Sequence, residues 1–182
     1  LFRSGATALF ALAPFGAFMF GSHMNHVTAL LFVMVAVLGL AHTVTRGGLP
    51  WALLCGLGFG AAATIRPLDA FAFALPAGGW LLWRAVAAVR AARGGGMVSE
   101  RAEGVALAAR GARVAHAALL ELLASGVGIA IPFAAMMIVN RRTTGSPLLF
   151  GYEVLWGASH GLGFHLAPWG VAHTPARGLE LI

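Results

Sequence analysis

The sequence predicts an all-α membrane protein, a polytopic bundle of transmembrane helices with about five spans within these 182 residues. Hydrophobic residues make up 59% of the chain and charged residues only 10%, which lies far from the composition of soluble proteins. The apolar residues also gather in long stretches. A helix needs roughly 20 apolar residues to cross a hydrocarbon core of about 30 Å, and the stretches are of this order.

The first two predicted spans cover residues 5–21, where Pro14 would introduce a kink, and residues 27–45. Residues 51–83 form one apolar run that, as a single helix at ~1.5 Å per residue, would be about 50 Å long, too long for one straight crossing. Something must interrupt it.

Proline supplies the interruption. Pro67 disfavours helical geometry at Arg66 and removes a backbone donor, so we expect two short helices of about 15 to 16 residues that meet at Arg66 in a hairpin. A fifth predicted span covers residues 119–139, with Pro132 inside it and Glu121 near its start.

The distribution of arginine predicts the orientation, because cytoplasmic loops carry an excess of basic residues. All twelve basic residues are arginines. With the first span directed outward, eight of them are cytoplasmic: Arg3, Arg46, Arg84, Arg90, Arg93, Arg101, Arg110 and Arg113. The four others are then external: Arg66, Arg141, Arg142 and Arg177.

Residues 1–139 are therefore expected to form a transmembrane region with an inner basic loop at about 84–118. Residues 140–182 are expected to form an outer-face loop, rich in aromatic residues and glycine, that leads to a further span. The chain starts with LFRSG and stops at LELI, where another apolar segment begins, so we expect a fragment of a longer protein. The basic residues are explained by topology, and no nucleic-acid partner is expected.

Arg66 and Asp69 are the first candidate site residues, because they lie three positions apart where the two short helices meet. In one interpretation Arg66 anchors the hairpin at the headgroups and Asp69 begins the next helix, where a negative charge is favourable. In the other, Arg66 holds a phosphate, which a guanidinium grips through two parallel hydrogen bonds.

A polar motif, SHMNH, precedes the second span and contains the candidates Asn25 and His26. It can act as an interfacial cap of the helix, or it can recognise a polar substrate at the membrane surface. His23 and His26 share a helical face, but no third ligand lies near, so we expect no metal. The single cysteine, Cys55, excludes a disulfide framework within the chain.

The tail carries aromatic side chains beside polar ones. Residues 140–182 are too polar and too rich in glycine to span, and aromatic residues of this density are typical of the membrane interface. The loop either only packs on neighbouring spans or binds sugar rings through aromatic faces and directed hydrogen bonds. The candidate residues are Asn140, Tyr152, Glu153, Trp156 and His160.

Three motifs in this order carry a family resemblance: SHMNHVTALLF, then GLGFGAAATIRPLDAFAFALP, then, after a basic segment, NRRTTGSPLLFGY. The chain resembles bacterial GT-C glycosyltransferases, the polytopic relatives of protein mannosyltransferases and of lipid A aminoarabinose transferase. The resemblance covers most of the 182 residues, although each motif is short.

The resemblance implies an enzyme of the cytoplasmic (inner) membrane that transfers a sugar, with inversion, from a polyprenyl-phosphate carrier to a glycan, lipid or protein acceptor on the outer face. It implies no cofactor besides this lipid-linked donor. The family's acidic general base would lie upstream of Leu1, because Asn25 and His26 stand where relatives often place an acid. The catalytic residue is therefore unassigned. A transporter and a non-catalytic membrane scaffold are the competing classes.

The arginine count generates a test of orientation. Cysteines introduced at Gly96 and Gly161 should be labelled by a membrane-impermeant thiol reagent from opposite sides of the membrane. Labelling of both positions from one side would overturn the orientation and the outer-face location of every candidate site residue.

Overall fold

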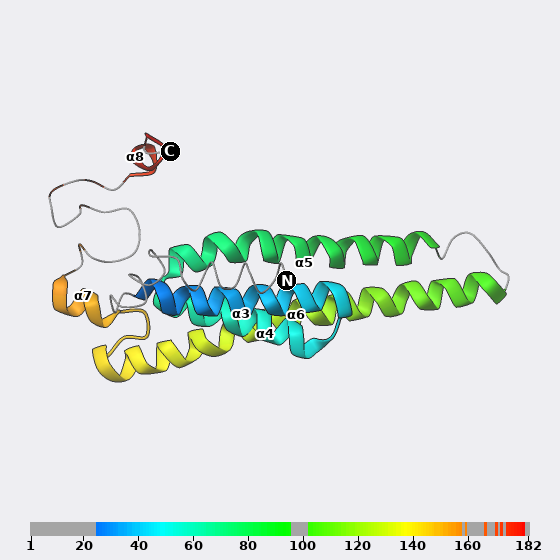
Figure 1. Cartoon of the computed structure of the whole chain (residues 1–182), viewed down its shortest axis with the longest axis horizontal. Helices are drawn as coiled ribbons and strands as arrows, with labels where there is room; N and C mark the ends of the chain where they lie inside the picture. The colour runs from blue at the N-terminus through cyan, green and yellow to red at the C-terminus, as the bar shows by residue number, and fades with distance from the viewer. Residues whose placement is uncertain are drawn as a thin grey trace, which may run out of the picture. The chain divides into compact units, whose positions relative to one another are not determined.

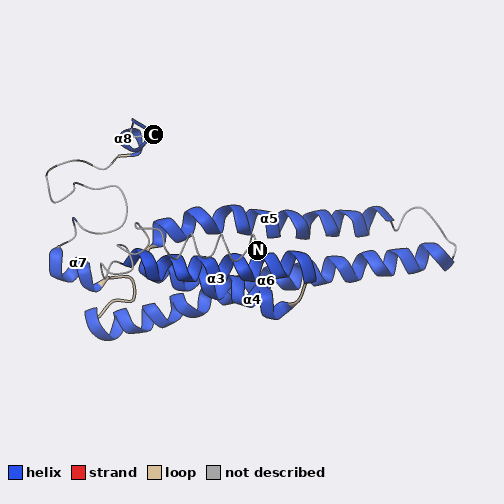
Figure 2. Ribbon diagram, in the orientation of Figure 1, coloured by secondary structure: helices blue, strands red, loops and turns tan. Residues whose placement is uncertain are grey.

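The computed structural model describes residues 25–95 and 102–157 and, in the tail, residues 159, 166, 170, 172 and 174–180. This part of the chain consists of helices joined by short turns, with an isolated bridge between Leu166 and Ala172 and no strand (Figure 2). The predicted all-α class is confirmed for it. The helices are α3 (Asn25–Arg46), α4 (Leu49–Ile65), α5 (Pro67–Gly95), α6 (Ala102–Thr144), α7 (Gly151–Trp156) and α8 (Pro175–Glu180).

The chain divides into two compact units, Leu1–Phe133 and Ala134–Ile182. The first contains α3, α4, α5 and the larger part of α6, which run alongside one another (Figure 1). The second contains the end of α6, α7 and α8. The boundary expected between residues 139 and 140 falls inside a continuous helix, because α6 ends only at Thr144.

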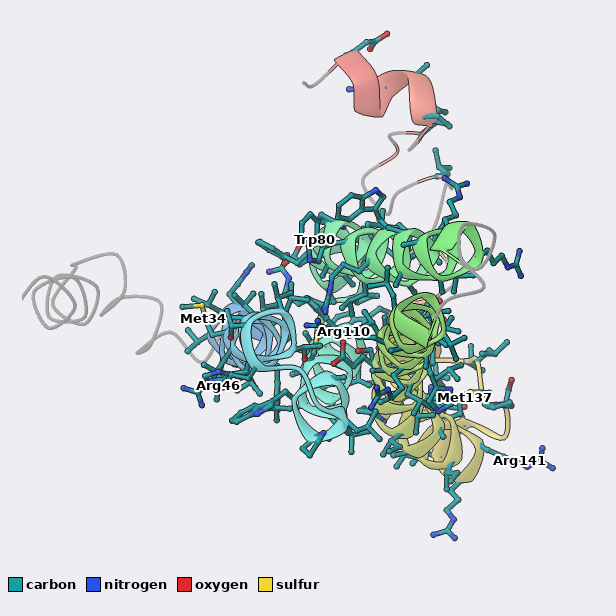
Figure 3. The ribbon with its side chains drawn as sticks, turned by 90° about the vertical axis from the view of Figure 1, so that its right-hand side faces the viewer. Met34, Arg46, Trp80, Arg110, Met137 and Arg141 are labelled. Carbon is teal, nitrogen blue, oxygen red and sulfur yellow. The ribbon has the colours of Figure 1, made fainter. Side chains whose placement is uncertain are left out.

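Three helical segments are long and apolar enough to cross a membrane: His26–Arg46, Pro67–Gly94 and Val105–Thr144. Large apolar side chains cover their outer surfaces, including Met34 on α3 and Trp80 on α5 (Figure 3). Residues 27–45, 49–65, 70–83 and 122–140 contain no Asp, Glu, Lys or Arg. The helices thus share an uncharged, apolar layer, as expected of a membrane protein.

The helix break at Arg66 and Pro67 is confirmed. Helix α4 ends at Ile65, Arg66 has φ −140° and ψ 83°, and Pro67 is the first residue of α5. The proline ring keeps the preceding residue out of helical geometry, while its own fixed φ suits the first position of a helix. Asp69 lies in the first turn of α5, as predicted. Local sterics therefore account for this hinge.

The second helix of the hairpin is not short, and this expectation was wrong. Helix α5 has 29 residues, about 44 Å at ~1.5 Å per residue, and α6 has 43, about 65 Å. The segment expected as an inner loop at 84–118 is helical in residues 84–95 and 102–118. It is rich in alanine and arginine, which favour helix with or without a membrane. The loss of hydrophobicity shows where the apolar layer ends. The helices continue past that point because the residues there have high helix propensity.

The predicted number of about five spans is not confirmed. Residues 5–21 lie outside the described residues. The stretch 119–139 is the later part of α6, and α4 is an apolar helix of 17 residues, about 26 Å, shorter than the three candidate spans.

Helix α4 packs against α3 and α6 through glycine. A Cβ atom on Gly58 would lie 2.6 Å from Ala36 N of α3, and one on Gly60 would lie 2.7 Å from Ile129 O of α6. On α6, a Cβ on Gly128 would lie 2.5 Å from Leu53 O. Such distances leave no space for a side chain, so the helix backbones are in direct contact. Gly56 and Gly60 are four residues apart and form a small-residue face of the kind that membrane helices use for close packing.

Polar and apolar side chains complete this packing. Ser125 of α6 donates a hydrogen bond to Ala52 O of α4 at 3.0 Å, and both residues are buried. Two small clusters of buried residues connect α3, α4 and α5. One consists of Ala36, Cys55, Phe59 and Ala77, and the other of Val33, Ala62 and Ala70. The core of the first unit therefore lies around α4.

The glycine contacts predict a position-specific effect on stability. Gly128→Ala should lower the free energy of unfolding by about 1–3 kcal/mol, because the added methyl group forces the backbones of α4 and α6 apart. Gly126→Ala, two residues away, has no atom within 4 Å of the new Cβ and should be neutral or stabilising by up to about 1 kcal/mol. Denaturation of the two purified variants in matched detergent micelles measures the difference; equal stabilities would contradict the direct α4–α6 contact.

Candidate functional site

Three of the predicted site residues come together at one end of the first unit. His26 lies in the first turn of α3, Arg66 at the hinge between α4 and α5, and Asp69 in the first turn of α5. Arg66 Nε lies 2.5 Å from Asp69 Oδ2, and Arg66 Nη1 donates to the imidazole of His26, with Nε2 at 2.8 Å. Residues that are 40 positions apart in the sequence thus share one cluster.

The packing below the cluster explains why these helix ends meet. Val33 of α3, Ala62 of α4 and Ala70 of α5 form a buried contact within two turns of the polar residues. Small side chains on α4 and α5 let the three helices approach closely at this level. The hinge then places the Arg66 side chain over the contact, toward the start of α3.

The Arg66–Asp69 pair is accessible. The Arg66 side chain is 31% exposed and that of Asp69 is 48% exposed. An ion pair with this exposure contributes at most about 1 kcal/mol to stability, because water screens it. Its more important effect is on geometry, since Asp69 and His26 hold the guanidinium from two sides while leaving it reachable by a ligand.

An apolar cavity of about 350 Å³ begins beside this cluster and lies between α4, α5 and α6. Ala63, one helical turn before Arg66, and Ala70, directly after Asp69, belong to its lining. Its other lining residues are Phe59, Phe71, Ala74, Leu75, Gly78, Gly79, Ile129 and Phe133. The hinge cluster therefore lies next to an apolar groove along α5, although Arg66 and Asp69 are not themselves among its lining residues.

No contact with the hinge cluster is described for Asn25 or Asn140. Asn25 is the first residue of α3, and its side chain lies outside the described residues. Asn140 belongs to the second unit, where it is buried and donates from Nδ2 to Pro147 O at 3.2 Å. Thr144 donates to Asn140 O at 2.8 Å. Asn140 therefore stabilises the turn after α6, a structural use of a residue predicted to bind substrate.

The remaining predicted residues lie in or after α7. Glu153 Oε2 accepts a hydrogen bond from Phe150 N at 3.2 Å and so caps the start of this helix. Trp156 is the last residue of α7 and is 68% exposed. The side chain of Tyr152 and the whole of His160 lie outside the described residues.

Within the described ranges, no group of three or more His, Cys, Asp or Glu residues could hold a metal ion. The hinge cluster of His26, Arg66 and Asp69 offers guanidinium, imidazole and carboxylate groups. These groups bind anions and donate or accept hydrogen bonds.

A second polar cluster, which the sequence did not predict, consists of Arg84, Glu121 and the backbone of Gly48. Glu121 is buried, its Oε1 accepts from Gly48 N at 2.9 Å, and its Oε2 lies 3.5 Å from Arg84 Nη1. One signal was available: Glu121 is the acidic residue at the start of an otherwise uncharged stretch. Such a residue is a functional candidate wherever it faces the interior of a bundle.

Comparison of the chain with protein-family models, with curated proteins and with solved structures finds no match. The resemblance to GT-C glycosyltransferases therefore rests on the three motifs and stays a prediction.

The exposure of the hinge ion pair predicts a small energetic coupling. In a double-mutant cycle with Arg66→Ala and Asp69→Ala, the coupling energy for unfolding in micelles should be below about 1 kcal/mol. A coupling of more than about 2 kcal/mol would instead identify the pair as the structural anchor of the hairpin. His26→Ala, measured in parallel, tests whether the imidazole adds to the anchor.

Proposed function

We propose that this chain is part of a membrane glycosyltransferase of the GT-C type. It transfers a sugar from a polyprenyl-phosphate carrier to an acceptor on the outer face of the bacterial cytoplasmic membrane. The observation that supports this proposal best is the partly exposed guanidinium of Arg66 beside the apolar groove between α4, α5 and α6. A polyprenyl phosphate combines the same two properties, a charged head and a long apolar chain.

In this proposal the carrier phosphate accepts hydrogen bonds from Arg66. Asp69 holds the guanidinium from the Nε side and His26 from the Nη1 side, so the arginine is oriented before the ligand arrives. His26 also supplies a second polar group beside the phosphate. The first isoprene units lie against Phe71 and Leu75 in the groove, which is open to the lipid.

The proposed reaction follows from this placement. An acceptor hydroxyl attacks the anomeric carbon, the bond from that carbon to the carrier phosphate breaks, and the phosphate leaves with its electron pair. Arg66 stabilises the negative charge that develops on this leaving group. Asp69 orients Arg66 in this proposal and is not assigned as the general base. The acceptor's proton therefore passes to a base outside the described cluster.

The tail contributes to acceptor binding in this proposal. Asn140 and Glu153 hold turns and a helix start, so their polar groups are already used. The aromatic residues Tyr152 and Trp156 are better suited to sugar rings, since flat faces bind the C–H groups of a ring. His160 keeps its predicted role as a polar partner of the acceptor.

The competing classes predict different features. A transporter needs polar groups along a path through the bilayer, whereas the described helices carry no charged residue between the levels of Asp69 and Arg84. A scaffold requires no oriented guanidinium beside a groove. The scaffold is therefore the easier alternative to distinguish from the glycosyltransferase, because a scaffold is expected not to bind the carrier.

Binding of a polyprenyl phosphate to the full-length protein in nanodiscs tests the first step. Arg66→Lys keeps the charge but loses the bidentate hydrogen bonding of the guanidinium. It should weaken carrier binding about tenfold or more, as expected for the loss of one charge-assisted hydrogen bond. Arg66→Ala should weaken it further. Transfer of radiolabelled sugar from polyprenyl-phosphate mannose and polyprenyl-phosphate aminoarabinose should fall in the same order.

Arg142→Ala is the matched control, because Arg142 is an exposed arginine near the end of α6 with no predicted ligand. It should leave carrier binding and transfer near the wild-type level at equal expression. Wild-type binding in both Arg66 variants would remove the phosphate role, and a lack of carrier binding by the wild-type protein would favour the scaffold.

A further inference from the structure

A second cavity lies between α5 and α6. The uncharged stretch of α5, residues 70–83, separates it from the hinge cluster. Its volume is about 290 Å³. Arg84 and Glu121 line it, and its other lining residues are Trp83, Ala87, Ala88, Val114, Ala117 and Ala118. Two opposite charges thus face a cavity whose remaining wall is almost wholly apolar.

The hydrogen bonds of this cluster are incomplete. Arg84 Nη1 is buried and has no hydrogen-bond partner among the described residues, although Glu121 Oε2 lies 3.5 Å away. Glu121 Oε1 is already occupied by the N–H of Gly48. A buried donor without an acceptor is costly. Because Nη1 itself has no accessible surface, the Arg84 side chain, which is 27% exposed, must rotate slightly before a ligand that also donates to Glu121 Oε2 can accept from this nitrogen.

The cavity lies at one end of the uncharged stretch of α5. Arg84 follows Asp69 by 15 residues on the same helix, about 22 Å along its axis, and no charged residue intervenes. Trp83 is 59% exposed and its ring centroid lies 5.0 Å from that of Trp80. Tryptophan is enriched at the membrane–water interface, so this pair marks the level at which phosphates and glycerol backbones lie.

We propose that this cavity binds the headgroup of a phosphatidylethanolamine-type lipid. The phosphate accepts hydrogen bonds from Arg84, and the primary ammonium donates to Glu121 Oε2. The acyl chains lie along the Trp80–Trp83 face of α5. A headgroup with only negative charge would meet the Glu121 carboxylate, and a choline headgroup has no N–H to donate, so neither completes the cluster. The ligand is a lipid because the rest of the lining is apolar and includes Trp83, whose ring contacts Trp80.

Native mass spectrometry of the full-length protein tests this proposal. The protein is equilibrated with equimolar phosphatidylethanolamine, phosphatidylglycerol and phosphatidylcholine that carry the same acyl chains. The wild type should retain phosphatidylethanolamine about tenfold over each of the others, the factor expected for one charge-assisted hydrogen bond. Arg84→Gln should lose the retained lipid, whereas Arg90→Gln, an exposed arginine on the same helix, should not.

Glu121→Gln keeps the test valid if Arg84→Gln does not fold. The amide oxygen can still accept from Gly48 N, so the start of α4 is preserved, while its NH₂ group cannot accept the ammonium. This variant should bind phosphatidylethanolamine and phosphatidylcholine about equally. A wild-type preference for phosphatidylglycerol, or a phosphatidylethanolamine preference that survives Glu121→Gln, would overturn the proposal. Displacement of the lipid by an equal concentration of free phosphoethanolamine would overturn its assignment to a lipid.

Discussion

Direct contact between the backbone of α4 and those of α3 and α6 is the constraint on which the other features depend. Glycines 56, 58, 60 and 128 leave no space for a side chain at these crossings. In a membrane, where lipid is as apolar as leucine, such close packing and an interhelical hydrogen bond like that of Ser125 drive helix association. A short helix is thereby held at the centre of the first unit.

The two ends of α4 take part in the two polar clusters. Its C-terminal end leads into Arg66, which meets His26 and Asp69. The residue before its first turn, Gly48, donates to Glu121 beside Arg84. Gly47 and Gly48 have φ values of 70° and 110°, which glycine adopts without strain, so the chain can turn tightly enough to reach this carboxylate. The length of α4, about 26 Å, accordingly sets the separation of the clusters.

Arg66 and Arg84 differ in their hydrogen-bond partners, and this difference suits different ligands. Arg66 is accessible and held by two side chains, an arrangement that favours a substrate which binds and leaves. Arg84 has a buried nitrogen without a hydrogen-bond partner among the described residues, an arrangement that favours a ligand which stays. The two proposals, an exchanging carrier at the hinge cluster and a resident lipid at the Arg84 cavity, follow this difference.

The sequence alone determined the structural class and the helix break at Arg66, through composition and local sterics. Apolar content predicted a helical membrane protein, and Pro67 predicted the break at Arg66 because its ring acts on the neighbouring residue. The lengths of α5 and α6 were missed, since helix propensity continues where hydrophobicity ends. The contacts of Arg66 with His26 and of Glu121 with Gly48 join residues 40 and 73 positions apart. Only the tertiary structure decided these contacts, because they depend on the register between packed helices, which glycine contacts set and no local pattern encodes.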